Sequence, residues 1–375
     1  MIYFDNAATT RYKSPEVIKS ALDCINNSYN ANRGNSSGVN ELMAQIFATR
    51  QKIARLVNAK QEDCVAFTKN CTEALNIAIL GSVKRNGHII ASVTEHNSVI
   101  RPIMELVKRG IVQATFVQPD EQGDITTDII KQAIKPNTYM AVFSHVSNVT
   151  GKKQDIETIG KFLFSYGVTF VADCAQSMGY LPIDMEKYHI DMLAFPSHKG
   201  LHGLQGSGAL VFKPEQMPSP IMYGGTGSDS ANIYQPNFSP DCFESGTLNA
   251  PSILGLSTAV DWWLQTRKDN LPKIVQLQKL LKEQLEQLPT CKVYSPFNAS
   301  GIVAFELENY DSDELGEILS SQGIVTRSGL HCAPLMHKHL QTQKKGLVRV
   351  SLSGENTVEE CFTLISLLDK LANQR

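Results

Sequence analysis

Several side chains that can do chemistry follow directly after short apolar runs in this sequence. Asp173 and Lys199 each follow such a run, and so do His96, His145 and Asn148. In open parallel sheets, ligands bind beyond the carboxyl ends of the strands. If the runs are parallel strands, an acid, an amine, two imidazoles and an amide therefore converge on one rim.

This set of residue types matches what pyridoxal phosphate (PLP) requires of a protein. Its aldehyde needs a lysine amine, and its ring nitrogen needs a carboxylate that keeps the ring an electron sink. Its phosphate needs backbone N–H groups at a helix start, which residues 68–73 would supply. Taken singly, an acid at a strand end is usually a cap or turn residue. The combination, rather than any one residue, predicts PLP bound at Lys199.

The elements that must position these residues are predicted by the runs themselves. The runs are continuous rather than alternating, which is typical of strands buried on both faces. Helix-like stretches separate them, so we expect a mostly parallel α/β sheet. The runs are residues 64–67, 88–93, 139–143, 169–172, 192–195 and 208–212.

A second, smaller unit is predicted after the glycine- and proline-rich residues 214–241. A long helical region at about 252–288 has apolar residues at helical spacing. Strands at 301–307 and 347–352 and a helix at about 358–372 indicate an α+β domain. We predict a large α/β domain over residues 14–245 and a small domain formed by residues 1–13 and 246–375.

At these motifs the sequence resembles a known family. Asp-Cys-Ala-Gln at residues 173–176 and Ser-His-Lys-Gly at 197–200 resemble the signature of class V aminotransferases of PLP fold type I. Residues that resemble the cysteine desulfurase and selenocysteine lyase branch are 5–10, 94–97, 147–151, 244–247 and 327–333. The resemblance covers essentially the whole chain in order. It implies a large domain with a mostly parallel seven-stranded sheet.

The resemblance implies roles for individual cofactor-binding residues. Lys199 would carry PLP, Asp173 would pair with the ring nitrogen, and His96 would stack on the ring and act in catalysis. Asn148 and Gln176 would reach the side of the phenolic oxygen. The phosphate would be held by Cys71, Thr72, Ser197, His198 and, across an obligate homodimer interface, Thr247 of the partner subunit.

The same resemblance implies how substrate is held. Arg349 would clamp the substrate carboxylate, because a guanidinium offers a planar two-donor fork. Ala7, Asn148 and Arg327 are the other predicted substrate contacts.

Cys332 decides which reaction is expected. In the resembling desulfurases a cysteine here attacks the sulfur of substrate cysteine, giving alanine and an enzyme persulfide. Such a nucleophile must be thiolate-like and reachable. Cys332 lies in a loop punctuated by glycine and proline, residues 329–334, and His331 and Arg327 are candidates to favour its thiolate. The predicted function is therefore a PLP-dependent cysteine desulfurase.

Several alternatives remain open from the sequence. A selenocysteine lyase, a cysteine or cystine β-lyase, or a class V aminotransferase would use the same cofactor. An inactive sulfur-transfer scaffold is also possible in principle, although the complete set of Asp173, Lys199 and Arg349 argues against it. A metal site made of Cys332, His337 and His339 fits no standard zinc spacing, so no metal is predicted.

Two departures from the family pattern stand out. The family usually has an arginine and a histidine in the glycine-rich loop at residues 32–39, where this chain has Asn35 or Ser36, and Val39, with Arg33 shifted. Cys71 replaces a small residue or threonine. The sequence does not choose between a sulfur and a selenium substrate.

The partners and location follow from loop type and composition. The cysteine loop is similar to that of the selenocysteine-lyase-like subgroup with a short loop, which implies transfer of sulfur to a dedicated acceptor protein. The net charge is −2 with charges mixed throughout, and the eight cysteines form no CxxC pair. No secretory signal or membrane-length apolar run is present. We expect a cytoplasmic protein that binds neither nucleic acid nor membrane.

Overall fold

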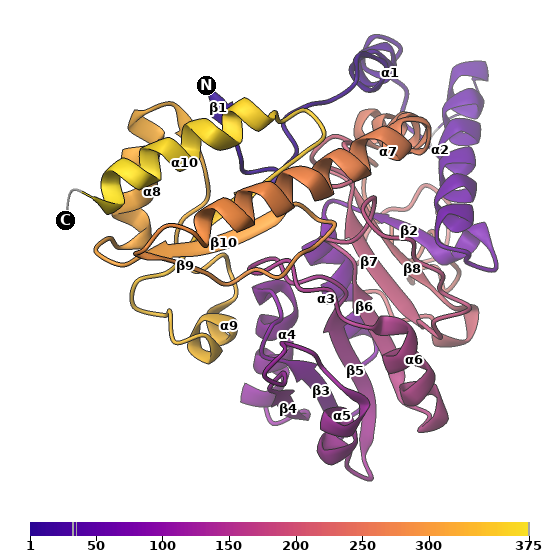
Figure 1. Ribbon diagram of the computed structural model, residues 1–375. Helices are drawn as coiled ribbons and strands as arrows, with labels where there is room; N and C mark the ends of the chain where they lie inside the picture. The colour runs from indigo at the N-terminus through magenta and orange to yellow at the C-terminus, as the bar shows by residue number, and fades with distance from the viewer. Residues whose placement is uncertain (32–33, 35, 374–375) are drawn as a thin grey trace.

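The computed structural model describes residues 1–31, 34 and 36–373, and these form an α/β fold around a seven-stranded sheet (Figure 1). The strand order is β2-β8-β7-β6-β5-β3-β4. Neighbouring strands are parallel except that β8 runs antiparallel to both β7 and β2. The strands are β2 Val65–Thr68, β3 His88–Ser92, β4 Gln113–Val117, β5 Thr138–Ser144, β6 Thr169–Asp173, β7 Met192–Pro196 and β8 Gly208–Phe212. The predicted fold class is confirmed.

The burial of the strands explains which of them the sequence predicted. Strands β2, β3, β6, β7 and β8 are buried at every position, as their continuous apolar runs require. Strand β4 was not among the predicted runs. It pairs only with β3 at the edge of the sheet, and most of its residues are exposed or half-buried. An edge strand needs no continuous apolar run, which is why the prediction missed it.

Helices cover both faces of this sheet and form two cores (Figure 1). On one face pack α3 (Cys71–Gly81) and α4 (Asn97–Lys108). On the other pack α2 (Ser37–Leu56), α6 (Ile156–Ser165) and the first part of α7 (Ala250–Leu285). The remaining helices are α1 Pro15–Asn26, α5 Thr127–Ala133, α8 Ser312–Ser321, α9 Pro334–His339 and α10 Val358–Ala372.

Helix α7 connects the large sheet to the C-terminal part of the chain. Val260 and Trp263, in its first half, are buried in the core of the large sheet. Leu277 and Leu285, in its second half, are buried in a separate core with the C-terminal strands and helices. The predicted long helix is confirmed, and the proposed domain boundary at residue 245 stays a prediction.

The C-terminal part is built on a small antiparallel sheet with the order β12-β10-β9. Its strands are β9 Cys291–Val293, β10 Ile302–Leu307 and β12 Val348–Ser351. Strand β1 (Ile2–Tyr3) pairs in parallel with β11 (Ile324–Val325), so the start of the chain lies against the C-terminal part. The register of β12 places Arg349 opposite Ala304.

The structure bears on two further predictions from the sequence, which concern the loop at residues 32–39 and membrane-spanning helices. In the departing loop at 32–39, Asn32, Arg33 and Asn35 lie outside the described residues, while Ser36 caps α2 and Val39 is buried. Every helix in the described part of the chain is too short or too polar to span a bilayer.

Candidate active site

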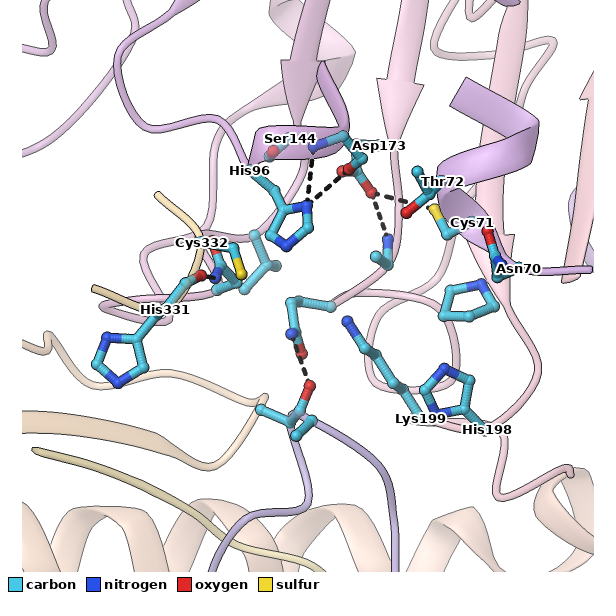
Figure 2. Close-up of a pocket in the computed structure, with 18 of the residues that line it drawn as sticks. Asn70, Cys71, Thr72, His96, Ser144, Asp173, His198, Lys199, His331 and Cys332 are labelled. Atoms are coloured by element: carbon cyan, nitrogen blue, oxygen red, sulfur yellow. Dashed lines mark hydrogen bonds between the residues drawn. The ribbon is translucent and has the colours of Figure 1, made fainter. Parts of the chain in front are cut away.

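A cavity of about 260 Å³ lies at the carboxyl ends of β5, β6 and β7 (Figure 2). Its walls come from sequence segments that are far apart, including the start of the chain and the loop before α9. Of the predicted site residues, all except Ser197 and Thr247 line it: Ala7, Cys71, Thr72, His96, Asn148, Asp173, Gln176, His198, Lys199, Arg327, Cys332 and Arg349. The structure brings these residues together, and their individual roles stay predictions.

Asp173 ends strand β6 and is a buried carboxylate at the back of the cavity. One of its oxygens accepts a hydrogen bond from the Ala175 N–H at 2.9 Å and lies 3.7 Å from the Cys71 Sγ. Burial raises the pKa of Asp173, and the Ala175 N–H and the positive charge of Lys199 oppose this shift. A cation placed against this carboxylate would therefore be strongly favoured.

Lys199 follows β7 and is half-buried in the cavity wall, with its amine directed into the cavity (Figure 2). Burial lowers the pKa of Lys199, although the negative charge of Asp173 pulls it back up. A lowered pKa increases the share of neutral amine, which is the nucleophilic form. The loop that holds Lys199 is fixed by Thr10, whose hydroxyl donates to the carbonyls of His198 and Lys199 at 3.0 and 3.2 Å.

His96 caps helix α4, and this cap fixes its ring. The Ser98 N–H donates to His96 Nδ1 at 3.1 Å, and the Ser98 hydroxyl lies 2.7 Å from the same nitrogen. Burial, aided by the positive charge of Lys199, lowers the pKa of His96 to about 4. The ring is therefore neutral at pH 7, and because Nδ1 accepts, its proton is on Nε2. A flat, uncharged ring is suited to stacking on an aromatic ligand.

The N-terminus of helix α3 forms the end of the cavity where a phosphate is predicted. Asn70 caps this helix by accepting from the Glu73 N–H at 2.9 Å, and Cys71 and Thr72 begin its first turn. Gly208 of β8 packs so closely that a Cβ there would lie 3.3 Å from the Cys71 nitrogen. The unpaired N–H groups of a helix start favour an anion.

Two predicted phosphate residues do not line this cavity. The Ser197 side chain is fully buried, donates to the Leu204 carbonyl and accepts from the Ser207 hydroxyl at 2.9 Å. Thr247 is exposed outside the cavity, in the loop that follows Glu244. The prediction that Thr247 acts in the partner subunit is compatible with this position and stays a prediction.

The predicted substrate clamp, Arg349, is buried and already carries two partners. Its Nη2 donates to Asp5 Oδ1 at 2.9 Å, and its Nη1 donates to the Asn148 carbonyl at 2.8 Å. Arg327 pairs with it through an isolated antiparallel bridge and lines the same cavity. Two guanidinium groups in one wall make this part of the cavity a site for an anion.

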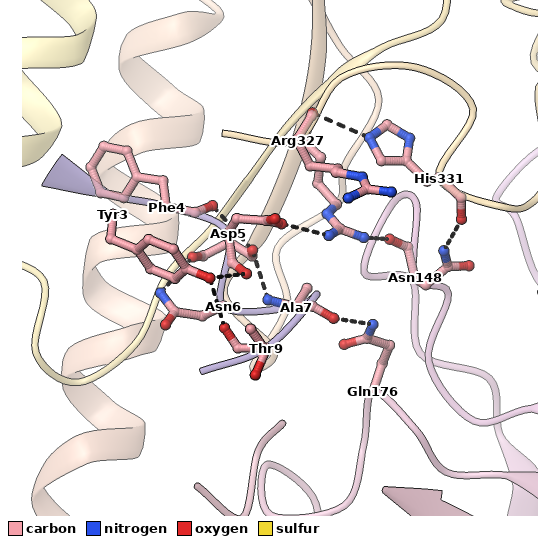
Figure 3. Close-up of polar contacts among 12 residues, drawn as sticks. Tyr3, Phe4, Asp5, Asn6, Ala7, Thr9, Asn148, Gln176, Arg327 and His331 are labelled. Atoms are coloured by element: carbon pink, nitrogen blue, oxygen red, sulfur yellow. Dashed lines mark hydrogen bonds and ion pairs between the residues drawn. The ribbon is translucent and has the colours of Figure 1, made fainter. Parts of the chain in front are cut away.

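The N-terminal segment ties several parts of the site together (Figure 3). Asp5 holds Arg349, the Ala7 carbonyl accepts from Gln176 Nε2 at 3.0 Å, and Thr10 holds the Lys199 loop. Ala7 N–H donates to the Ser351 hydroxyl at 2.8 Å, which links the segment to β12. The sequence motif at residues 5–10 is therefore a structural bridge between the two halves of the cavity.

Cys332 lies across the cavity from Lys199 (Figure 2). All eight cysteines belong to the described residues, and among them Cys332 alone is exposed. His331 and Cys332 both adopt left-handed backbone conformations, with φ of 50° and 56°. Such a conformation costs a non-glycine residue of order 1–3 kcal/mol. It persists only where surrounding contacts hold the backbone, as they do at functional sites.

Sequence reasoning missed three contributors to this site. Asp5 was recognised only as part of a motif, Ser98 orients His96, and Ser144 lines the cavity while donating to the buried Glu95 carboxylate. Burial raises the pKa of Glu95 to about 7. Only the contact of Ser98 is local in sequence, because Ser98 lies two residues after His96. The other two act through contacts that the sequence does not reveal.

The alternative metal site is not assembled in the described part of the chain. No group of three His, Cys, Asp or Glu side chains is gathered there in a way that could hold a metal ion. His337 Nδ1 lies 2.8 Å from the Thr342 hydroxyl, and His339 Nδ1 lies 2.8 Å from Gln118 Oε1.

The donors and acceptors of the cavity fit PLP. The Gln176 Oε1, His198 Nδ1 and Arg349 Nε atoms are buried without a hydrogen-bond partner among the described residues. Buried polar atoms are usually paired, so unpaired ones around a cavity indicate a polar ligand. A buried acid, a lysine amine, a neutral flat ring and a helix start match the ring nitrogen, aldehyde, ring face and phosphate of PLP.

Nearly the whole chain is similar to proteins of one family. Residues 2–364 match the family model described as "Aminotransferase class-V". A "Probable cysteine desulfurase" of Pyrococcus abyssi is 32% identical, with 99% of this chain and 94% of the relative covered. A "Cysteine desulfurase" of Klebsiella pneumoniae is 28% identical, with 99% and 93% covered.

Solved structures give the same result for the fold. The apo structure of a cysteine desulfurase from Thermococcus onnurineus has a TM-score of 0.92 and 28% identity, covering 100% of this chain and 95% of that one. A cysteine desulfurase of Escherichia coli in an S-sulfonic acid form has a TM-score of 0.88 and 25% identity, covering 99% and 94%.

Proposed function

The chain belongs to the class-V aminotransferase family and, within it, to the cysteine desulfurases and their relatives; we propose that it is itself a PLP-dependent cysteine desulfurase. It would convert L-cysteine to L-alanine and keep the sulfur as a persulfide on Cys332. The family is PLP-dependent, and in this chain Lys199 would carry the cofactor, with Asp173, His96, His198 and the start of α3 around it.

The observation that carries this proposal is the position of Cys332. It is the exposed cysteine of the chain, and it lines the same cavity as Lys199 and Arg349. An aminotransferase or a β-lyase needs the lysine and the carboxylate clamp but has no use for a thiol opposite them. A reachable thiol at this place is what transfer of the substrate sulfur requires.

Each of these residues would have its own role in the reaction. Arg349 and Arg327 bind the carboxylate of the amino acid. Lys199, as a neutral amine, would accept the proton from the substrate Cα and return it to Cα on the same face of the cavity. PLP, when bound, supplies the electron sink that makes loss of the Cα proton possible. The buried Asp173 keeps a positive charge on the ring nitrogen stable.

The sulfur step balances without any further reactant. The Cys332 thiolate attacks the sulfur of the bound cysteine, the Cβ–S bond breaks, and its electron pair stays with Cβ. Cβ then takes up a proton, for which the Nε2–H of His96 is a donor in the cavity wall. One thiol and one cysteine therefore give one persulfide and one alanine, with the transferred sulfur oxidised and Cβ reduced.

Alanine release from L-cysteine tests the proposal. Wild-type protein should form alanine, Cys332→Ala should lose at least about 10²-fold of that rate, and Lys199→Ala should lose both alanine formation and the visible absorbance of bound PLP. If Cys332→Ala forms alanine at the wild-type rate, the persulfide mechanism is wrong. Pyruvate and ammonia in place of alanine would identify a β-lyase.

We also propose the homodimer that the predicted role of Thr247 requires. Large apolar side chains are exposed near this loop, namely Tyr223, Ile233, Tyr234 and Phe238. The Gly246 N–H donates to the Gly225 carbonyl at 2.8 Å, which joins this apolar segment to the Thr247 loop. Exposed apolar patches of this kind are typical of interfaces. Sedimentation should give a dimer, and Ile233→Asp with Tyr234→Asp should give a monomer that retains PLP poorly.

The cysteine loop resembles that of the subgroup with a short loop, and we propose on this ground that a sulfur-acceptor protein takes up the persulfide sulfur. The exposed position of Cys332 would let an acceptor thiol reach the persulfide. A small thiol reductant should replace this acceptor and raise steady-state turnover. A cytoplasmic location stays a prediction. The sequence does not choose between cysteine and selenocysteine, and a parallel assay with selenocysteine decides between them.

A further inference from the structure

We propose that His337 is a positioning residue for Cys332: with His331 it forms a buried, directed hydrogen-bond chain that holds the cysteine loop against the cavity. The role of Cys332 as sulfur acceptor comes from the proposed function.

In the hydrogen bonds that link Arg327, His331, His337 and Thr342, the donor and the acceptor at each step can be assigned in only one way. His331 Nε2 lies 3.3 Å from the Arg327 carbonyl (Figure 3), and a carbonyl only accepts, so this nitrogen carries the proton. In a neutral His331 ring, Nδ1 must then accept from His337 Nε2, which lies 3.4 Å away. His337 Nδ1 in turn accepts from the Thr342 hydroxyl at 2.8 Å.

Burial makes both rings neutral and fixes their orientation. His337 is fully buried, and His331 and Thr342 are almost so. The two rings stack with centroids 5.5 Å apart and an interplanar angle of 20°. Burial lowers the pKa of His337 to about 4 and that of His331 well below its usual value. Neither ring is charged at pH 7, so each has one donor and one acceptor nitrogen. This is what the hydrogen bonds between Arg327, His331, His337 and Thr342 require.

The backbone next to this chain is in a conformation that needs support. His331 and Cys332 are consecutive non-glycine residues with φ of 50° and 56°. Two contacts hold their carbonyls: Asn148 Nδ2 donates to the His331 carbonyl at 2.7 Å, and the Asn97 N–H donates to the Cys332 carbonyl at 2.7 Å. The imidazole of His331 is the third attachment, and its position depends on His337.

This series of hydrogen bonds ends at Arg327, which is bonded to the strand that carries Arg349, the predicted substrate clamp. The Arg327 carbonyl that accepts from His331 also accepts from the Arg349 N–H at 2.7 Å. The Asn97 N–H, which holds Cys332, belongs to the residue after His96. Cys332 is therefore fixed relative to both the carboxylate clamp and the ring that caps α4. A displacement of about 1 Å in such a geometry costs up to about 10²-fold in rate.

Single-turnover alanine formation from L-cysteine tests this role. His337→Phe keeps the ring volume but removes the donor, and we expect the first alanine to form about tenfold more slowly. The KM for cysteine and the visible absorbance of bound PLP should stay within about twofold of wild type. His337→Gln places an amide N–H near the position of Nε2 and should recover most of the rate. A merely structural role would not be rescued in this selective way.

A second variant and a control variant complete this experiment. Thr342→Val removes only the hydroxyl that sets the His337 tautomer and should also slow the first turnover, so the inference does not depend on the folding of His337→Phe. His339→Phe, on the same helix but bonded to Gln118, should leave the rate unchanged. Wild-type rates in both His337→Phe and Thr342→Val would overturn the inference.

Alkylation of Cys332 separates this inference from the proposed function. The rate of iodoacetamide modification, followed on the Cys332 peptide by mass spectrometry, does not depend on turnover. Release of the left-handed loop should make it at least about threefold faster in His337→Phe, and an unchanged or slower rate would contradict the inference. If Cys332→Ala still formed alanine, the proposed function would fail while the alkylation result still decided the role of His337.

Discussion

At the scale of single residues, Arg349 illustrates how the chain prepares a place for an anion. A guanidinium has five N–H groups, and the structure assigns two of those of Arg349 to Asp5 and the Asn148 carbonyl. Its Nε is buried without a partner among the described residues. Asp5 neutralises the buried charge and holds the planar group in place, and the remaining N–H groups can donate to both oxygens of a carboxylate.

Replacing Arg349 by lysine should separate its charge from its shape. Lysine can keep the ion pair with Asp5, but it lacks the planar fork. We expect kcat/KM for L-cysteine to fall about 10²-fold, corresponding to roughly 3 kcal/mol for a buried charged contact, mainly through KM. Steady-state kinetics measure this, with the exposed Arg109→Lys as the control. A KM equal to that of wild type would show that Arg349 does not bind the carboxylate.

The chemically distinctive residues could be predicted from the sequence, but several of their supports could not. Asp173 and Lys199 follow apolar strands, so their place on one rim follows from local pattern alone. Asp5 and Arg349 are separated by 344 positions, and only the folded chain brings them together. His337 was considered as a possible metal ligand, because a sequence shows residue types but not the through-space partners that make it a hydrogen-bond donor.

At the scale of elements, one buried ion pair joins three segments near the predicted interface loop. Glu244, at the start of the Thr247 loop, accepts hydrogen bonds from Nη1 and Nη2 of Arg50 in α2, at 2.6 and 2.5 Å. The same carboxylate accepts from the Phe67 N–H of β2 at 2.7 Å, and Arg50 also donates to the Val65 carbonyl. Both side chains are almost fully buried. This pair fixes the loop to the large sheet.

Removing the charge of Glu244 should destabilise the protein strongly. Glu244→Gln keeps the size of the side chain but leaves the buried Arg50 without a counter-ion, which costs about 3–5 kcal/mol of unfolding free energy. Urea unfolding measures this loss. The exposed pair of Glu105 and Arg109 provides the control, because Glu105→Gln should change stability by less than about 1 kcal/mol. Equal effects of the two variants would show that the buried pair does not anchor the loop.

The elements themselves could be predicted to different degrees. Buried strands and the helices α7 and α10 were predicted because continuous or periodic apolar patterns mark them. The strands that were missed, β1, β4, β9 and β11, are short or lie at the edges of their sheets. Such strands bury little side-chain surface, so their pairing is set by neighbours rather than by their own composition.

At the scale of the whole molecule, buried histidines make stability depend on pH. Burial lowers the pKa of His88, His96, His198, His202 and His337 to about 4 and that of His145 to about 3, compared with 6.5 for an ordinary histidine. The unfolded chain therefore takes up protons at a higher pH than the folded one. Their contribution to stability is present above pH 6.5 and is lost as the pH falls toward 4.

We expect the urea midpoint of unfolding to be clearly lower at pH 5 than at pH 7. Glu95 acts in the opposite direction, because its raised pKa of about 7 makes the folded state bind a proton more tightly. Burial also raises the pKa of Asp173 and Asp191, which act in the same direction as Glu95. The histidines with a lowered pKa, which include His331, outnumber these three carboxylates, so the unfolding midpoint should rise as the pH rises. A flat profile, or a higher midpoint at pH 5, would show that the histidines are not held neutral by burial.

If Cys332 receives the sulfur of L-cysteine, the mass of the Cys332 peptide must show it. Wild-type protein with PLP is mixed with L-cysteine without reductant, quenched after one turnover and digested. We expect the Cys332 peptide to gain the mass of one sulfur atom in proportion to the alanine formed, and a reductant to remove this added mass. Alanine formation with an unmodified Cys332 peptide would show that Cys332 does not receive the sulfur.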